Sequence, residues 1–92
     1  MARQKEHDLY GALRDSRFAF LGRGERHIEE IYRAVEAAYP HLCDNSYYCS
    51  ENCSAGNDQP EWKHTVRNAL QFLKSNGGNI RFTGRRGYWQ FQ

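Results

Sequence analysis

The sequence predicts an α+β fold, with a helical core followed by a C-terminal β-hairpin. Residues 25–39 and 60–76 carry apolar side chains at the spacing of amphipathic helices. Residues 79–91 have the pattern of two short strands joined by a glycine-flanked turn. A length of 92 residues suits one small domain, so we expect residues 1–92 to fold as a unit.

Two helical segments are expected before the middle of the chain. Residues 1–22 predict an N-terminal arm or short helix, because Leu9, Tyr10 and Leu13 share one side of it. Glycines at 22 and 24 then interrupt the pattern. The helix predicted over 25–39 is strongly amphipathic and ends at a proline. Its apolar side is formed by Ile28, Ile31, Tyr32, Val35, Ala38 and Tyr39.

Residues 40–59 form an irregular, cysteine-containing insertion that interrupts the helical pattern. Loops of this length are usually functional, held by something, or contain an element of their own. A short helical turn at Tyr47 and Tyr48 is one such element. Four soft metal ligands fall in or beside this insertion, namely His41, Cys43, Cys49 and Cys53. Their spacing lacks the usual Cys-x2-Cys pair of zinc sites, so we expect free or partly buried thiols and no cofactor. Zinc and a disulfide are the alternatives.

The third helix is predicted over residues 60–76. Asp58, Pro60 and Glu61 have the order of a capping box followed by a helix start. Gly77 or Gly78 suits the left-handed residue that ends a helix. The apolar stripe consists of Trp62, Val66, Ala69, Leu70 and Leu73. We therefore expect this helix to pack one side on the core.

The opposite side of this helix has the chemistry of a DNA-reading surface. Lysines contact phosphates, arginine forks bind guanine, and Asn or Gln side chains bind adenine. Every surface helix has a polar side, and a merely solvated one is the alternative. However, the helix carries no carboxylate after Glu61, whereas solvated helices usually mix charges. The predicted DNA-binding residues here are Lys63, His64, Arg67, Asn68, Gln71 and Lys74.

The hairpin adds three arginines, Arg81, Arg85 and Arg86, around a turn flanked by Gly84 and Gly87. Adjacent arginines repel each other unless they meet anions, and arginine suits phosphates and narrow minor grooves. The alternative is an edge hairpin that uses charge to prevent aggregation. We predict that all three arginines bind DNA.

Charge is distributed unevenly along the chain, whose net charge is only +2. Residues 25–60 carry two Lys/Arg and seven Asp/Glu, and residues 61–92 carry six Lys/Arg and one Glu. Such asymmetry points to a nucleic acid or a membrane. The longest apolar run has four residues, far below the roughly 20 needed to cross a bilayer. We therefore expect no membrane contact, a cytoplasmic location and a nucleic-acid partner.

The order of helices followed by a basic hairpin is the plan of a winged helix-turn-helix. The chain resembles the winged-helix domain at the N-termini of Mrr-type restriction endonucleases and in related nuclease-fused modules. The resemblance covers residues 60–89 and rests on PEWKHTVRNAL at 60–70, Leu73-Lys74, Gly77 and Gly87-Tyr88-Trp89. It implies a recognition helix over 60–76, a wing over 79–91 and a nuclease domain C-terminal in the parent protein. It also implies the target-recognition module of a restriction-type endonuclease, sensitive in some cases to modified cytosine.

The predicted function is therefore binding of double-stranded DNA, without catalysis by this domain. The sequence shows no nuclease motif, nucleophile–base pair or carboxylate dyad. The alternatives are a winged-helix module for protein contact or dimerisation, including a homodimer, and a transcriptional regulator. They remain open because a fold does not determine a function.

Overall fold

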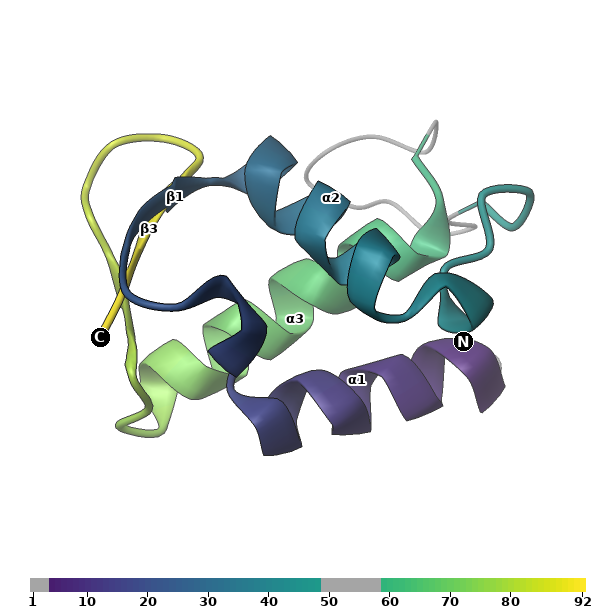
Figure 1. Ribbon diagram of the computed structural model, residues 1–92, viewed down its shortest axis with the longest axis horizontal. Helices are drawn as coiled ribbons and strands as arrows, with labels where there is room; N and C mark the ends of the chain where they lie inside the picture. Colours follow the sequence, from purple (N-terminus) through teal and green to yellow (C-terminus); the bar gives the residue numbers. More distant parts are fainter. Residues whose placement is uncertain (1–3, 49–58) are drawn as a thin grey trace.

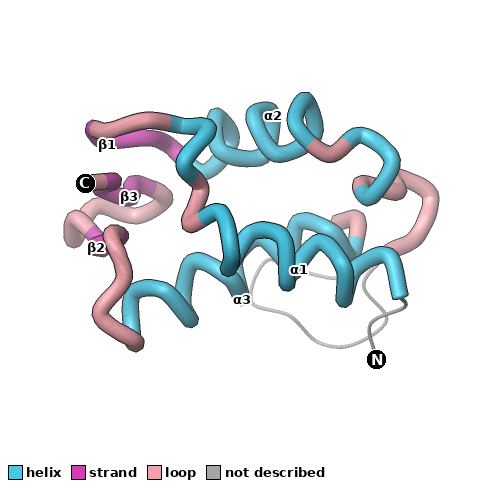
Figure 2. The backbone as a smooth tube through the Cα atoms, turned by 60° about the horizontal axis from the view of Figure 1, so that its bottom comes forward, coloured by secondary structure: helices cyan, strands magenta, loops and turns pink. Residues whose placement is uncertain are grey.

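A computed structural model describes residues 4–48 and 59–92 and confirms the α+β class. The described part holds three α-helices and a three-stranded antiparallel sheet that lies at one end of the helices (Figures 1 and 2). This arrangement is compatible with a winged-helix-like fold. The elements are α1 (Gln4–Ser16), β1 (Gly24–His27), α2 (Ile28–Ala38), α3 (Glu61–Ser75), β2 (Ile80–Phe82) and β3 (Tyr88–Phe91), with 3-10 turns at Ala19–Leu21 and Pro40–Leu42.

Strand β1 corrects the prediction of one helix over 25–39. Residues 24–27 pair with β3 in an antiparallel register that runs from Gly24 opposite Phe91 to His27 opposite Tyr88. The helix begins only at Ile28, because the Nδ1 atom of His27 caps it by accepting a hydrogen bond from the Glu29 amide at 3.2 Å. A four-residue strand formed with the far end of the chain leaves no local pattern to detect.

The predicted hairpin is confirmed as β2 and β3, and β3 is the central strand of the sheet order β1-β3-β2. Gly84 and Gly87 have φ values of +91° and +84°, which explains why glycine flanks the turn. The Gly87 carbonyl accepts a hydrogen bond from the Ile28 amide at 2.7 Å. The turn is thereby fastened to the start of α2.

The core lies between α1, α2, α3 and the inner face of the sheet. The predicted stripe of α3 is buried, as are Leu9 and Leu13 of α1 and Ile31, Tyr32 and Val35 of α2. In contrast, Ala38 is exposed. Phe18 is buried against Phe91 although its φ of +58° is unusual for a non-glycine residue. No sequence pattern indicated this residue as the corner between α1 and the sheet.

The described part of the 40–59 insertion is tied to the helices. The expected helical turn at Tyr47 and Tyr48 is wrong, because Tyr48 forms an isolated antiparallel bridge with Pro60. The indole N–H of Trp62 donates to the Asn45 side chain at 2.9 Å, and that amide donates to Glu36 at 2.7 Å. These bonds satisfy polar groups that helix packing alone would leave unpaired.

Helix α3 begins at Glu61, where Pro60 occupies the cap position without a side-chain cap. The predicted cap, Asp58, lies outside the described residues. The expected C-terminal glycine is confirmed as Gly77, with a φ of +69°. Gly78 follows, and its amide donates to the Leu73 carbonyl at 2.7 Å.

We expect Gly78→Ala to lower the free energy of unfolding by about 1–3 kcal/mol, because the added methyl would overpack this helix end. A Cβ at Gly78 would lie 2.7 Å from the Leu73 carbonyl oxygen. Gly11→Ala is the matched control: nothing lies within 4 Å of its Cβ, and alanine within α1 should stabilise by about 0.5–1 kcal/mol. Urea unfolding followed by circular dichroism measures both, and equal midpoints for the two variants would contradict this packing.

Candidate nucleic-acid interface

The polar side chains of α3 lie on two flanks of the helix. Lys63 and Lys74 lie on the flank toward α2 and toward residues 79–91. We call residues 79–91 the wing. The Lys63 ammonium is 5.1 Å from the centre of the Tyr32 ring, and that of Lys74 is 5.8 Å from the centre of the Phe82 ring. These distances permit cation–π attraction, which orients both lysines without neutralising them.

Gln71 and Asn68 of α3 are both exposed, but they lie on different sides of the helix. Gln71 faces the same hollow as Phe82 of the wing. Asn68 borders a hollow shared with Glu6, and Glu6 belongs to α1. The His64 Nδ1 atom lies 4.0 Å from the Glu61 carboxylate. The structure therefore brings together only part of the predicted set beside the wing.

Arg67 points between the helices, unlike the exposed base reader that the sequence predicts. Its Nη1 atom donates to the Tyr32 hydroxyl and to the Gln59 side-chain oxygen, each at 2.9 Å. Its Nη2 atom is buried and has no hydrogen-bond partner among the described residues. An unsatisfied buried donor costs about 1–3 kcal/mol, so this guanidinium is a place where an acceptor from a ligand would add stability.

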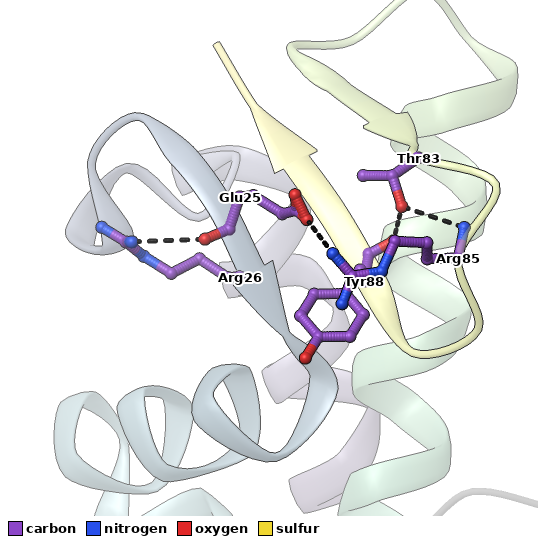
Figure 3. Close-up of polar contacts among 5 residues, drawn as sticks. All are labelled: Glu25, Arg26, Thr83, Arg85 and Tyr88. Atoms are coloured by element: carbon purple, nitrogen blue, oxygen red, sulfur yellow. Dashed lines mark hydrogen bonds and ion pairs between the residues drawn. The ribbon is translucent and has the colours of Figure 1, made fainter.

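The three wing arginines differ in what they contact. Arg81 and Arg86 are exposed, and within the described ranges neither has an ion-pair or hydrogen-bond partner. Arg85 instead lies 3.4 Å from the Glu25 carboxylate of β1, and its guanidinium lies 4.0 Å from the centre of the Tyr88 ring (Figure 3). The charge of Arg85 is therefore partly neutralised within the protein.

The backbone of the wing turn is braced beside this pair. The Thr83 hydroxyl accepts a hydrogen bond from the Arg85 amide at 3.1 Å and donates to the Tyr88 carbonyl at 3.2 Å (Figure 3). Figure 3 also shows the Arg26 guanidinium reaching the Glu25 carbonyl, at 3.4 Å. The turn thus presents its arginines from a hydrogen-bonded frame.

A cleft of about 560 Å³ opens between the start of α2, α3 and the wing, and we call it the wing cleft. Arg67 and Gln71 of α3, Arg86 of the wing and Glu29 of α2 contribute its charged and polar groups. The full lining is Ile28, Glu29, Tyr32, Gln59, Arg67, Gln71, Phe82, Gly84, Arg86, Gly87 and Trp89. Sequence reasoning missed Glu29 and Phe82 as site residues, because only the docking of the wing on α2 brings them together.

The zinc alternative is only partly covered by the described residues. Cys43 is a buried free thiol, and burial together with the nearby Glu36 and Glu6 carboxylates raises its pKa to about 12. Such a thiol stays protonated at neutral pH. His41 is exposed, and Cys49 and Cys53 lie outside the described residues. Residues 4–48 and 59–92 contain no cluster of three metal-binding side chains.

No helix in the described part of the chain has the length and apolar character needed to cross a membrane. Comparisons with protein-family models, curated proteins and solved structures find no match to this chain. A function for this chain is therefore proposed from the geometry of the site.

We expect Cys43 to react with a thiol reagent roughly a thousandfold more slowly in the folded protein than in the unfolded chain at pH 8, because the thiolate is the reactive form. The rate is measured on a variant with Cys49→Ser and Cys53→Ser, with and without denaturant. Since the folded pKa is the higher one, the stability this thiol contributes is present below about pH 9 and is lost as the pH rises toward 12. Equal rates in both states would contradict the burial of Cys43.

Proposed function

We propose that this chain binds double-stranded DNA as a winged helix-turn-helix, with α3 as the recognition helix and residues 79–91 as the wing. One observation carries the proposal: α3 and the wing lie side by side and present cations that no carboxylate of the described residues neutralises. These cations are Lys63, Lys74, Arg81 and Arg86. DNA presents phosphates along both grooves, so cations presented by a helix and by the hairpin beside it match its backbone.

The arrangement of the helices supports the same proposal. In helix-turn-helix proteins the second helix lies in the major groove and the first crosses the backbone. Here α3 would be the second helix and α2 the first. The exposed Gln71 and Asn68 are the side chains of α3 suited to read adenine, whereas the cations position the duplex.

The structure changes the role proposed for Arg67. Its bonds to Tyr32 and Gln59 fix one nitrogen within the protein. It therefore connects α3 to α2, and only its buried second nitrogen lacks a partner among the described residues. His64, whose Nδ1 atom lies 4.0 Å from the Glu61 carboxylate, is a phosphate contact in this proposal.

The wider biological setting rests on the resemblance to Mrr-type domains alone. On that basis, the domain is the target-recognition module of a restriction-type endonuclease in the cytoplasm, and a nuclease domain lies C-terminal to it in the parent protein. Sensitivity to modified cytosine is part of that proposal. The domain itself would bind and would not catalyse.

A protein-contact or dimerisation module is the second candidate, and one feature favours it. Phe20 is 39% exposed and packs edge-on against Tyr39, with the two ring centres 5.9 Å apart. Exposed aromatic side chains are common at protein interfaces. A transcriptional regulator would combine such an interface with the DNA surface.

We expect binding to a randomised duplex library to weaken with salt, with a slope of log K against log salt near −3.6 for four phosphate contacts. Arg86→Ala should reduce this slope by about 0.9 and weaken binding on all sequences. Arg85→Ala is the matched control and should have a smaller effect, since Glu25 already offsets that charge. Fluorescence anisotropy over a series of salt concentrations measures each slope.

Glu25→Gln extends this test, because it frees Arg85 from its carboxylate and should raise affinity for DNA. Binding that does not depend on salt, or an Arg86→Ala variant that binds as well as the parent, would contradict the proposal. A chain that binds no DNA at low salt but self-associates with rising concentration would favour the protein-contact alternative.

A further inference from the structure

The wing cleft lies between the two elements that would hold DNA. Gln71 of α3 stands on one side of it and Arg86 of the wing on the other, and both are exposed. A duplex bound by α3 and the wing would therefore pass over its mouth. Its volume of about 560 Å³ is within the range of small-molecule sites, about 300–1,000 Å³.

Aromatic side chains form one wall of the cleft. The Phe82 and Trp89 rings lie with their centres 5.3 Å apart, and Phe82 remains 41% exposed although it is a large apolar residue in a sheet. A planar ring stacked on Phe82 would cover it. A phosphate would gain nothing from this wall, whereas nucleobases stack on aromatic side chains regardless of sequence.

The polar groups of the cleft have opposite hydrogen-bonding characters. Glu29 brings a carboxylate that only accepts, and Arg67 brings a guanidinium that only donates and has one buried nitrogen unpartnered within the described residues. A phosphate would be attracted by Arg67 and Arg86 but would leave the Glu29 carboxylate without a donor. A heterocycle that carries an amino group beside a ring nitrogen or carbonyl would satisfy both.

We propose that the wing cleft receives one nucleobase extruded from the bound duplex, and that this base carries an exocyclic amino group. The base stacks on Phe82, its amino group donates to Glu29, and a ring nitrogen or carbonyl accepts from Arg67. Extruded bases are commonly read by such stacking and by bonds to their pairing edge. The inference rests on the proposed DNA binding and adds which part of the duplex enters the protein.

The test compares short duplexes that differ at one position: a normal pair, a cytosine opposite an abasic site, and a uracil opposite an abasic site. An unpaired base is extruded at little cost, so its binding reports the cleft directly. Uracil has a carbonyl where cytosine has its amino group, and a ring N–H where cytosine has the neighbouring acceptor nitrogen. We expect the protein to bind the unpaired-cytosine duplex about tenfold more tightly than the unpaired-uracil duplex, since in the same position uracil would set a carbonyl against the Glu29 carboxylate and an N–H against the Arg67 guanidinium.

Two neighbouring variants separate the cleft from general charge effects. Glu29→Gln should remove most of the preference for cytosine over uracil, because an amide can both donate and accept. Glu30→Gln is the matched control: Glu30 lies one residue further along α2 and lies 3.8 Å from Arg26 in an ion pair. The Glu30→Gln variant removes the same charge from a residue outside the cleft lining, so it should keep the preference for cytosine over uracil.

Each outcome bears on a different proposal. Equal affinity for cytosine and uracil, or a Glu29→Gln variant that keeps the preference, overturns the base pocket. If the normally paired duplex still binds with the expected salt dependence, DNA binding stands without the pocket. If none of the three duplexes binds at low salt, the proposed function falls and the base pocket falls with it.

Discussion

The central strand β3 is the constraint on which the rest of the structure depends. It pairs with β2 inside the hairpin and with β1 from the other end of the chain. Because β1 runs directly into α2, this pairing also fixes where that helix begins, and the Gly87–Ile28 hydrogen bond fastens the wing turn to the same point. Trp89 and Phe91 of β3 then carry the sheet onto the helical core.

This pairing decides how charge is arranged at the proposed interface. Glu25 belongs to the acidic middle of the sequence, yet β1 places it beside Arg85 of the basic wing. On the wing, Arg81 and Arg86 are exposed, whereas the third arginine is held against a carboxylate and the Tyr88 ring. Solvent screening keeps such an exposed ion pair weak, so a phosphate could compete with Glu25 for the guanidinium.

The attachment of the wing to the start of α2 also creates the wing cleft, and it brings acidic, basic and aromatic side chains together there. The first turn of α2 supplies Glu29, α3 supplies Arg67, and the hairpin supplies Phe82. A purely basic groove would suit the DNA backbone alone. A groove that also holds a carboxylate and an exposed aromatic ring suits a nucleobase of the same duplex.

The sequence by itself determined the helices, the hairpin and the basic C-terminal third, because periodicity, Gly77 and the arginines act locally or by composition. Only the tertiary structure decided β1, the left-handed corner at Phe18, the inward turn of Arg67 and the pairing of Arg85 with Glu25. The physical reason is that each of these depends on a partner distant in sequence. A short strand takes its hydrogen bonds from another segment, and a side chain on a helix flank turns toward whatever packs beside it.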